Sequence, residues 1–484
     1  MQVLSSLINI DQAAPQAVYI QIACQLQKLI QEGALQANTR LPSTRDLSSV
    51  LKVHRKTVVK AYDELLTQGW VQSHQGNGTF VAAHLPEMKV QSLNKATSGI
   101  DHTKQAGFNI TVAAHLERKL VKVTSTYHLD DGFPDTRLAP LHDLSRAYRT
   151  QLLTGNPYTR LGYTDTKGSE WLRQELSTYL NETRGVNTTA ENIVIVRGTV
   201  MGLYLTSTAL LQTGDSVVVG SLSWSGADQI FLQAGANLIK VGVDEHGIKV
   251  DELEQICQKN TVRLVYITSH HHYPTTVTLR ADRRIELLRL SEKYGFIIFE
   301  DDYDYDFHYL NRPLMPLAGA DKAGMVLYCG SFTKTISPAF RVGYLVGPQN
   351  VIDHLAKIRR IIDRQGDTML ENAMAELLQN GIIQRHMRKA LRAYRLRRDV
   401  FCDLMKSQLN SYASFEVPDG GMAVWTQFDS SINLPKLAQR ALKKDLFIAD
   451  TTAHPSLNAI RLGFASSTET ELEHSVEVLV NLLR

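Results

Sequence analysis

Cysteine is scarce in this sequence. The 484 residues include only Cys24, Cys257, Cys329 and Cys402, and no two of these form a CxxC pair. This scarcity excludes a disulfide-built fold and a paired-cysteine zinc site, and it fits a reduced, cytoplasmic protein. The sequence also lacks an apolar run of about eighteen residues and an N-terminal basic segment followed by an apolar one. We therefore expect neither a membrane span nor a secretory signal.

A strong net charge is missing as well. The formal charge of +3 at pH 7 gives no sign by itself of a nucleic-acid partner. A hydrophobic content of 43% with 21% charged residues is typical of a soluble globular protein with a large core. A chain of this length is expected to form about two or three domains.

Residues 1–82 have the pattern of three short helices and a β-hairpin. Apolar residues recur at helical spacing in three stretches, one of which is opened by a capping box of Ser43 and Asp46. Two β-like runs then flank a hairpin-type turn at 73–78. This order predicts a winged helix-turn-helix, whose third helix (58–66) would enter a major groove with its basic N-terminal end foremost. The alternative is a helical packing domain with a solvated charged face.

The same region resembles the GntR-type winged helix. The matching segments are Leu41–Leu47, Val53–Val58, Ala61-Tyr62 and Gly76–Val81, within a similarity that runs through nearly all of residues 15–82. This resemblance implies that the module binds double-stranded promoter DNA, with Gly76 at the tip of the wing. The other residues that the resemblance places against DNA are Arg45, His54, Arg55, Lys56, Thr57 and Lys60.

Residues 83–125 lack clear periodicity and are rich in polar residues, most visibly from Ala83 to His115. We interpret this stretch as a polar linker that carries no chemistry. Its length would allow the N-terminal module to sit on a partner subunit.

From residue 126 to residue 484, strand-like apolar runs alternate with helical stretches. This alternation predicts an α/β body with a mostly parallel central sheet and a ligand site at the carboxyl ends of its strands. We expect a large subdomain at about 160–370 and a small subdomain formed by the flanking segments. The strand-like runs are Ile193–Val196, Val217–Val219, Leu264–Thr268, Phe296–Phe299, Met325–Tyr328 and Val342–Val346.

One lysine stands out after the run Met325–Tyr328. Ser331, Lys334 and Arg341 follow it at a spacing that suits a phosphate anchor beside an amine able to form a Schiff base. Pyridoxal 5′-phosphate (PLP) chemistry needs this combination. The alternative is a strand-exit loop that carries an exposed lysine.

Other strand ends carry groups that suit the same cofactor. Gly198-Thr199-Val200 enters a helix, whose first backbone N–H groups form a natural phosphate site, although an ordinary strand–helix turn is the simpler interpretation. Trp224 is placed either to stack on a pyridine ring or merely to pack. In the run 300–306 (EDDYDYD), a carboxylate would hold a pyridinium N–H and a tyrosine would bond the phenolic oxygen of the cofactor.

Two patterns invite a metal hypothesis, and we expect no metal site from either. A calcium loop that starts at Asp302 would need glycine at its sixth position and a carboxylate at its twelfth, but these are Phe307 and Pro313. The adjacent histidines His270-His271-His272 would point to opposite sides of an extended segment, and no CxxC or HExxH partner exists.

Together these features resemble a fold-type I PLP-dependent aminotransferase over residues 126–484, and the order of module, linker and body resembles the MocR subfamily of GntR-type transcriptional regulators. Matching segments are Gly132–Asp135, Tyr158–Gly168, Glu300–Asp304, Gly330–Lys334, Gly420–Trp425 and Ile460–Phe464. The resemblance implies that Lys334 forms the Schiff base with PLP and that Arg461 binds the carboxylate of an amino-acid effector. The further PLP contacts that it implies are Asp301, Tyr303, Trp224 and Tyr273 at the ring, and Gly198, Thr199, Val200, Ser331 and Arg341 at the phosphate.

Some positions depart from the aminotransferase pattern. Tyr273 stands where aminotransferases carry an asparagine, and MocR-like proteins tend to have an aromatic residue there. Thr276 replaces a usual glycine, and Gly226 stands where a member that senses γ-aminobutyrate would have an arginine. The resemblance thus implies a homodimeric, PLP-dependent DNA-binding regulator that senses PLP or an amino compound other than γ-aminobutyrate. A catalytically active aminotransferase with an accessory DNA-binding domain is the alternative.

A basic cluster near residue 390 suggests a second DNA contact. On a helix its members would form a basic stripe against DNA that flanks the operator, or simply a solvated face. The cluster consists of Arg385, Arg388, Lys389, Arg392, Arg395, Arg397 and Arg398.

Overall fold

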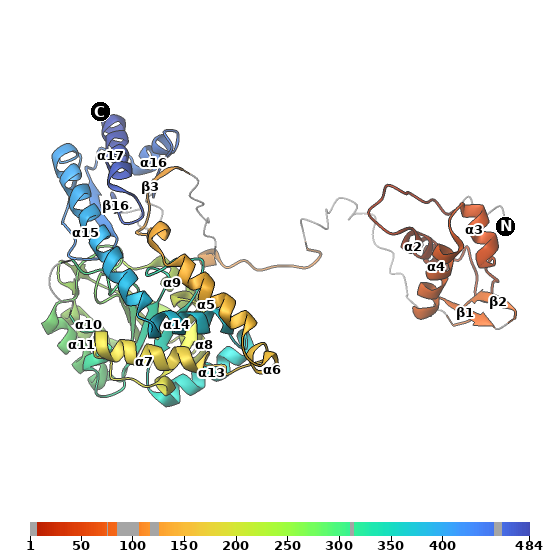
Figure 1. Ribbon diagram of the computed structural model, residues 1–484, viewed down its shortest axis with the longest axis horizontal. Coiled ribbons are helices and arrows are strands. Elements are labelled where there is room, and N and C mark those ends of the chain that lie inside the picture. Colours follow the sequence, from red (N-terminus) through yellow and green to blue (C-terminus); the bar gives the residue numbers. More distant parts are fainter. Residues whose placement is uncertain (1–6, 75, 85–105, 117–124, 310–313, 450–456) are drawn as a thin grey trace. The chain divides into compact units, whose positions relative to one another are not determined.

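The structure is a computed structural model that describes residues 7–74, 76–84, 106–116, 125–309, 314–449 and 457–484. Residue contacts divide the chain into two compact units, 1–111 and 112–484, which we call the module and the body (Figure 1). Most of the linker predicted at 83–125 lies outside the described residues. No helix within the described ranges has both the length and the apolar character that crossing a bilayer requires.

The described residues of the module form three helices and a two-stranded antiparallel sheet. Its side chains enclose one apolar core, in which Ile22, Leu26 and Leu65 are fully buried. Ser43 caps the second helix, because its hydroxyl accepts the backbone N–H of Asp46 at 3.1 Å. The elements are α2 (Val18–Gln31), α3 (Thr44–Leu51), α4 (Arg55–Thr67), β1 (Val71–His74) and β2 (Gly78–Val81). This arrangement confirms the winged helix expected from the sequence.

The body is centred on a seven-stranded sheet of spatial order β4-β12-β11-β10-β9-β5-β6. Only β12 runs antiparallel to its neighbours, so the expected mostly parallel sheet is confirmed. The strands are β4 (Ile193–Val196), β5 (Ser216–Gly220), β6 (Asn237–Val241), β9 (Val262–Ile267), β10 (Ile297–Asp302), β11 (Val326–Ser331) and β12 (Gly343–Val346).

Helices cover both faces of this sheet, as Figure 1 shows. On one face Leu203 and Phe231 pack in a cluster with Phe299, and on the other Leu287 packs with Ile298. Burial on both faces explains why the central strands are continuously apolar in the sequence. The helices are α7 (Glu170–Arg184), α8 (Thr199–Leu210), α9 (Ser225–Gln233), α10 (Val250–Lys259), α11 (Ala281–Tyr294), α12 (Leu317–Ala320), α13 (Gln349–Ile362) and α14 (Thr368–Gln379).

The flanking segments form a smaller layer around an antiparallel sheet of order β13-β14-β16, beside a parallel pair of β15 and β3. Helix α15 (Ile382–Gln408) runs from this layer to the helices of the large sheet (Figure 1). The other helices and strands of the flanking segments are η2 (Ala114–Leu116), β3 (Tyr127–Leu129), η3 (Thr136–Leu138), α5 (Leu141–Leu153), α6 (Pro157–Arg160), β13 (Ala413–Phe415), β14 (Ala423–Phe428), α16 (Leu434–Leu442), β15 (Leu446–Ile448), β16 (Ala459–Gly463) and α17 (Glu469–Leu483). The described part of the body also contains three short elements: η4 (Ala190–Asn192), β7 (Val243–Asp244) and β8 (Gly247–Ile248).

The structure corrects the basic stripe expected on residues 385–398. Arg397 and Arg398 are buried at 6% exposure each, and Arg397 pairs with Asp135 at 2.9 Å. Arg398 likewise pairs with Asp399 at 2.6 Å. These two arginines are held by carboxylates because a buried cation needs a counter-charge, so they cannot face DNA. The other five residues of the cluster are exposed on α15.

Candidate functional site

Residues of β10 alternate between the two faces of the sheet, and this alternation divides the acidic run at its carboxyl end. Glu300 caps α12, because its carboxylate accepts the backbone N–H of Leu317 at 2.9 Å. Asp302 accepts the hydroxyl of Tyr328 at 2.5 Å. Both carboxylates are therefore occupied by structural contacts on one face of the sheet.

Asp301 faces the other side of the sheet, toward the start of α8. It is 4% exposed and accepts hydrogen bonds from the hydroxyls of Tyr266 at 2.8 Å and Thr199 at 3.2 Å. Burial raises the pKa of Asp301 from its ordinary 3.8 to about 7, although both hydrogen bonds act in the opposite direction. Within the described residues no salt bridge pairs Asp301 with a cation. A ring N–H that carries positive charge would supply the missing partner.

Lys334 lies in the turn that directly follows β11, half-buried. Its ammonium donates to the carbonyl of Gly132 at 2.7 Å and lies 4.6 Å from the ring centroid of Phe133. Burial lowers the pKa of Lys334, and the nearby carboxylate of Asp131 partly opposes this shift. A lowered pKa increases the fraction of neutral amine, which is the form that attacks a carbonyl. The alternative of an exposed lysine in a strand-exit loop does not match this environment.

The first turn of α8 and the turn after β11 lie at the same edge of the sheet. Gly198 caps α8 with a φ of 75°, and a Cβ atom there would come within 2.9 Å of Nη2 of Arg341. The same Nη2 donates to the carbonyl of Arg197 at 2.7 Å. Ser331 pairs in register with Gly343, which in turn pairs with Val196. The Arg341 guanidinium thus lies at the N-terminus of α8, and Ser331 ends a strand at the same edge of the sheet; a cation at a helix N-terminus suits an anion site.

Arg461, on β16, is held by three groups. Its Nη1 donates to the carbonyl of Pro274 at 3.1 Å, and its guanidinium carbon lies 4.9 Å from the ring centroid of Tyr273. Its Nε lies 2.9 Å from one carboxylate oxygen of Asp131, and the hydroxyl of Tyr273 donates to the other at 3.0 Å. Arg461 therefore already faces a carboxylate, and that carboxylate belongs to the chain itself.

Tyr303 is positioned between these groups. Its hydroxyl donates to the carbonyl of His271 at 2.9 Å, and burial raises its pKa. Arg461, Asp131 and Asp301 all act on the same hydroxyl electrostatically. Together with Lys334, these side chains come from strands far apart in the sequence and form one cluster.

Trp224 occupies the N-terminal end of α9 and packs against the apolar cluster of that face. A Cβ atom on Gly226 would lie 2.5 Å from its indole, so the ring covers the position where an arginine would stand in a γ-aminobutyrate-sensing member. Within the described residues, no hydrogen bond or ring contact joins Trp224 to Lys334 or Asp301. Its stacking role stays a prediction.

The three adjacent histidines connect their segment to neighbouring segments of the chain through hydrogen bonds. Nε2 of His270 lies 2.6 Å from the carbonyl oxygen of Leu314, and Nδ1 of His271 lies 2.8 Å from the carboxylate of Asp304. His272 lies 2.9 Å from the carbonyl oxygen of Leu222, and burial lowers its pKa to about 4. Thr276 follows with a φ of 65°, a conformation that explains why glycine is usual there.

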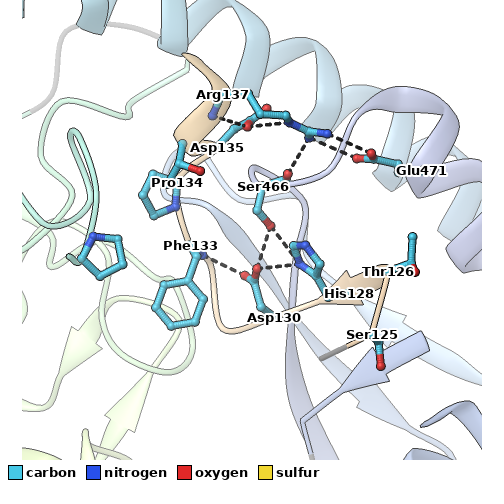
Figure 2. A pocket seen from close by; sticks show the side chains of 12 residues that line it. Ser125, Thr126, His128, Asp130, Phe133, Pro134, Asp135, Arg137, Ser466 and Glu471 are labelled. Atoms are coloured by element: carbon cyan, nitrogen blue, oxygen red, sulfur yellow. Dashed lines mark hydrogen bonds and ion pairs between the residues drawn. The ribbon is translucent and has the colours of Figure 1, made fainter. Parts of the chain in front are cut away.

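A pocket borders the segment 130–137 (Figure 2). Asp130 holds this segment, because one of its carboxylate oxygens accepts the backbone N–H groups of Gly132 at 2.9 Å and Phe133 at 2.8 Å. Its other oxygen accepts the hydroxyl of Ser466 at 2.7 Å, as Figure 2 shows. The backbone around Asp131 is therefore anchored, while the Asp131 side chain is not part of this network.

The residues predicted to contact DNA cluster at α3, α4 and the wing. His54 caps α4, because its Nδ1 accepts the backbone N–H of Lys56 at 3.1 Å. Nε of Arg55 donates to the hydroxyl of Thr44 at 3.3 Å, and Gly76 lies in the hairpin turn with a φ of 82°. Arg45, His54, Arg55, Lys56, Lys60 and Gly76 are exposed, and Thr57 is half-buried.

Two residues of the cluster around Lys334 were missed by the sequence reasoning. Tyr266 lies inside an apolar run, where a tyrosine is expected to belong to the hydrophobic core. Only its position near the end of the strand indicated that its hydroxyl could donate to Asp301. Asp131 directly precedes the quoted segment Gly132–Asp135, but its contact with Arg461 joins distant parts of the chain.

Comparison with known proteins agrees with this architecture. The aminotransferase class I and II family matches residues 135–479, and the gntR family of bacterial regulatory proteins matches residues 18–81. The chain belongs to the aminotransferase class I and II family. With its gntR-type module, it has the domain composition of the MocR-type regulators, and the predicted subfamily is confirmed.

The relatives match this chain along most of their own length. The probable rhizopine catabolism regulatory protein MocR of Rhizobium meliloti is 27% identical over 432 residues, which are 88% of this chain and 85% of the relative. The uncharacterized HTH-type transcriptional regulator YdfD of Bacillus subtilis is 28% identical over 465 residues, 95% of this chain and 94% of the relative. The crystal structure of Pyrococcus horikoshii kynurenine aminotransferase, in complex with PMP, matches with a TM-score of 0.68 and 26% identity over 74% of this chain and 91% of that chain. The fold class, a winged helix followed by a fold-type I aminotransferase-like body, is thereby confirmed.

Proposed function

We propose that this MocR-type chain is a PLP-dependent transcriptional regulator that acts in the cytoplasm as a homodimer. Its winged helix would bind promoter DNA, and its body would hold PLP at Lys334 and sense PLP itself or an amino compound. The observation that supports this most directly is the placement of Lys334 and Asp301 at the ends of two adjacent parallel strands. Because the same chain carries a DNA-binding module, we interpret Lys334 and Asp301 as parts of a sensor rather than of an enzyme that turns over substrate.

The residues present fit PLP. Asp301 is a buried carboxylate without a cationic partner among the described residues, and a protonated ring nitrogen would offset the burial that raises its pKa. Because Gly198 has no Cβ atom, the Arg341 guanidinium can approach the first turn of α8 closely, and a cation at a helix N-terminus suits a phosphate there. When bound, PLP would supply an electrophilic carbonyl that captures primary amines.

Four residues of the site would then have separate roles. Lys334 would present its amine to the carbonyl carbon of PLP, and Asp301 would retain the proton on the ring nitrogen. The Tyr303 hydroxyl would donate toward the phenolic oxygen instead of the carbonyl of His271. Arg461 would orient the carboxylate of an amino-acid effector. Effector binding would change DNA affinity only to the extent that it favours one of two conformations of the body.

The alternative is a working aminotransferase, and Lys334 with Asp301 would serve it equally well. Tyr273 argues against efficient turnover. Its hydroxyl donates a hydrogen bond to Asp131, and its ring packs against the guanidinium of Arg461. An aromatic side chain here occupies the position where aminotransferases carry an asparagine against the ring.

One purified full-length preparation tests the proposal. Addition of PLP should produce a Schiff-base absorbance band that borohydride abolishes. Lys334→Ala should lack the band, whereas Lys357→Ala, at an exposed lysine on α13, should keep it. The protein should also bind DNA upstream of its own or neighbouring genes, with an affinity that PLP or an amino acid changes.

Three outcomes decide between the interpretations. Multiple turnovers with an amino acid and a 2-oxo acid would favour the aminotransferase. Absence of the absorbance band would refute the cofactor role. Failure to bind any such upstream DNA would refute the regulator.

A further inference from the structure

The carboxylate of Asp131 lies where Arg461 would receive the carboxylate of an amino acid. It is held by two groups at once, Nε of Arg461 at 2.9 Å and the hydroxyl of Tyr273 at 3.0 Å. A guanidinium flanked by a tyrosine hydroxyl is the kind of donor set that binds a ligand carboxylate. The chain thus fills this donor set with its own side chain.

The two partners of this ion pair differ in exposure. The side chain of Arg461 is 5% exposed and that of Asp131 is 41% exposed. The arginine is therefore fixed within the protein, while the aspartate reaches it from the solvent side and can rotate back into water. Because Asp130 holds the backbone N–H groups of Gly132 and Phe133, this rotation does not require the segment to unfold.

The pairing is also incomplete on the arginine side. The Nε–H of Arg461 is buried and forms no aligned hydrogen bond among the described residues, although the carboxylate oxygen lies close to it. A buried donor without an aligned acceptor lowers stability, so a better-placed carboxylate would be favoured. A free ligand can adopt the in-line geometry that a side chain tethered at residue 131 does not reach.

We propose that Asp131 is a tethered competitor that an amino-acid ligand must displace from Arg461, and that it thereby determines which amines this body accepts. Two carboxylates cannot share one buried guanidinium without mutual repulsion. An α-amino acid therefore binds only by expelling Asp131, whereas an amine without a carboxylate leaves the pair intact. This inference rests on the proposed function, because it assumes that PLP and its amine partner occupy the cluster around Lys334.

Two stable cofactor adducts test the proposal on cofactor-free full-length protein. N-(5′-phosphopyridoxyl)-L-alanine carries the carboxylate, and N-(5′-phosphopyridoxyl)ethylamine is identical except that it lacks it. Calorimetry gives both dissociation constants without any turnover. In Asp131→Asn, the alanine adduct should bind about tenfold more tightly than to the wild type, which corresponds to about 1.4 kcal/mol. The ethylamine adduct should change by less than about twofold, a factor worth only a few tenths of a kcal/mol.

Two controls identify the cause. Glu473→Gln removes one charge from an exposed position on α17 and should leave both affinities unchanged. In an Arg461→Gln background the effect of Asp131→Asn should disappear, and binding of the ethylamine adduct there shows that this variant is folded.

The outcomes separate this proposal from the proposed function. If both adducts bind but Asp131→Asn weakens the alanine adduct, or changes both adducts equally, Asp131 is not a competitor and the inference is overturned. If neither adduct binds to the wild type, the PLP site itself is wrong and the inference fails with it.

Discussion

Replacing Asp301 by asparagine keeps the shape of the side chain and removes its charge. The pKa of Asp301 is raised from 3.8 to about 7, so ionising it in the folded protein costs about 4 kcal/mol at 1.36 kcal/mol per pH unit. The folded pKa lies above the unfolded one, and the folded protein therefore holds the proton more tightly. Stability that depends on this group falls as the pH rises from about 4 to about 7 and is constant above that range.

The asparagine variant should escape most of this cost. Its amide oxygen can still accept one of the hydroxyls of Tyr266 and Thr199, and the loss of the other hydrogen bond costs about 1–2 kcal/mol. Without PLP, Asp301→Asn should therefore be more stable than the wild type by about 2–3 kcal/mol at pH 8 and about equally stable at pH 5. With PLP this lead at pH 8 should shrink to about zero, because the variant lacks the charge-assisted hydrogen bond to the ring nitrogen, worth about 1.5–3 kcal/mol.

Urea unfolding of the full-length protein, followed by tryptophan fluorescence with and without PLP at pH 5 and pH 8, measures all these differences. Asp403→Asn, at an exposed position on α15, is the matched control and should behave as the wild type. The reasoning is refuted if Asp301→Asn is the less stable protein at pH 8 without PLP. It is also refuted if PLP stabilises the variant as strongly as it stabilises the wild type.

Three further changes have defined outcomes. Gly198→Ala should lower PLP affinity at least about tenfold, because the new methyl group meets Arg341 at 2.9 Å and the φ of 75° disfavours alanine; equilibrium dialysis that finds unchanged affinity would contradict the phosphate site. Leu65→Ala removes a fully buried side chain from the module and should cost about 2–5 kcal/mol, so DNA binding in a mobility-shift assay should weaken while the PLP absorbance persists. The hydrogen bond to Asp130 raises the pKa of His128, so its stabilising effect is complete below the ordinary value of 6.5 and is lost as the pH rises through the folded pKa. His128→Gln should therefore lower the melting temperature more at pH 6 than at pH 9, and a larger loss at pH 9 would show that the sign is wrong.

The sequence was sufficient for the central strands and insufficient for the contacts between them. Runs such as Ile193–Val196 could be predicted because a strand buried on both faces is continuously apolar. Strand β6 was missed, because Asn237 and Lys240 are exposed at this edge of the sheet and interrupt the apolar run. The ion pair of Arg397 could not be foreseen either, since no local pattern distinguishes a buried arginine from its exposed neighbours on α15.

The candidate site shows the same division. The location of the candidate site could be predicted because ligand sites gather at the carboxyl ends of parallel strands, whereas only the resemblance singled out Asp301 within the run 300–306. The contact between Asp131 and Arg461 joins the segment after β3 to the distant strand β16, and sequence spacing carries no information about such a contact.

The alternation along β10 has a consequence for the evolutionary history of this domain. Glu300 and Asp302 hold α12 and Tyr328 in place, so natural selection for a folded body acts on them whatever the protein binds. Asp301 and Tyr303 also have hydrogen-bond partners within the fold, but a buried Asp301 without a cation among the described residues costs stability, so selection for the cofactor would act mainly on these two. A descendant that had abandoned PLP while retaining its fold should therefore preserve positions 300 and 302 and vary at 301 and 303. Within a stretch of four consecutive residues, the two selective pressures could be read separately.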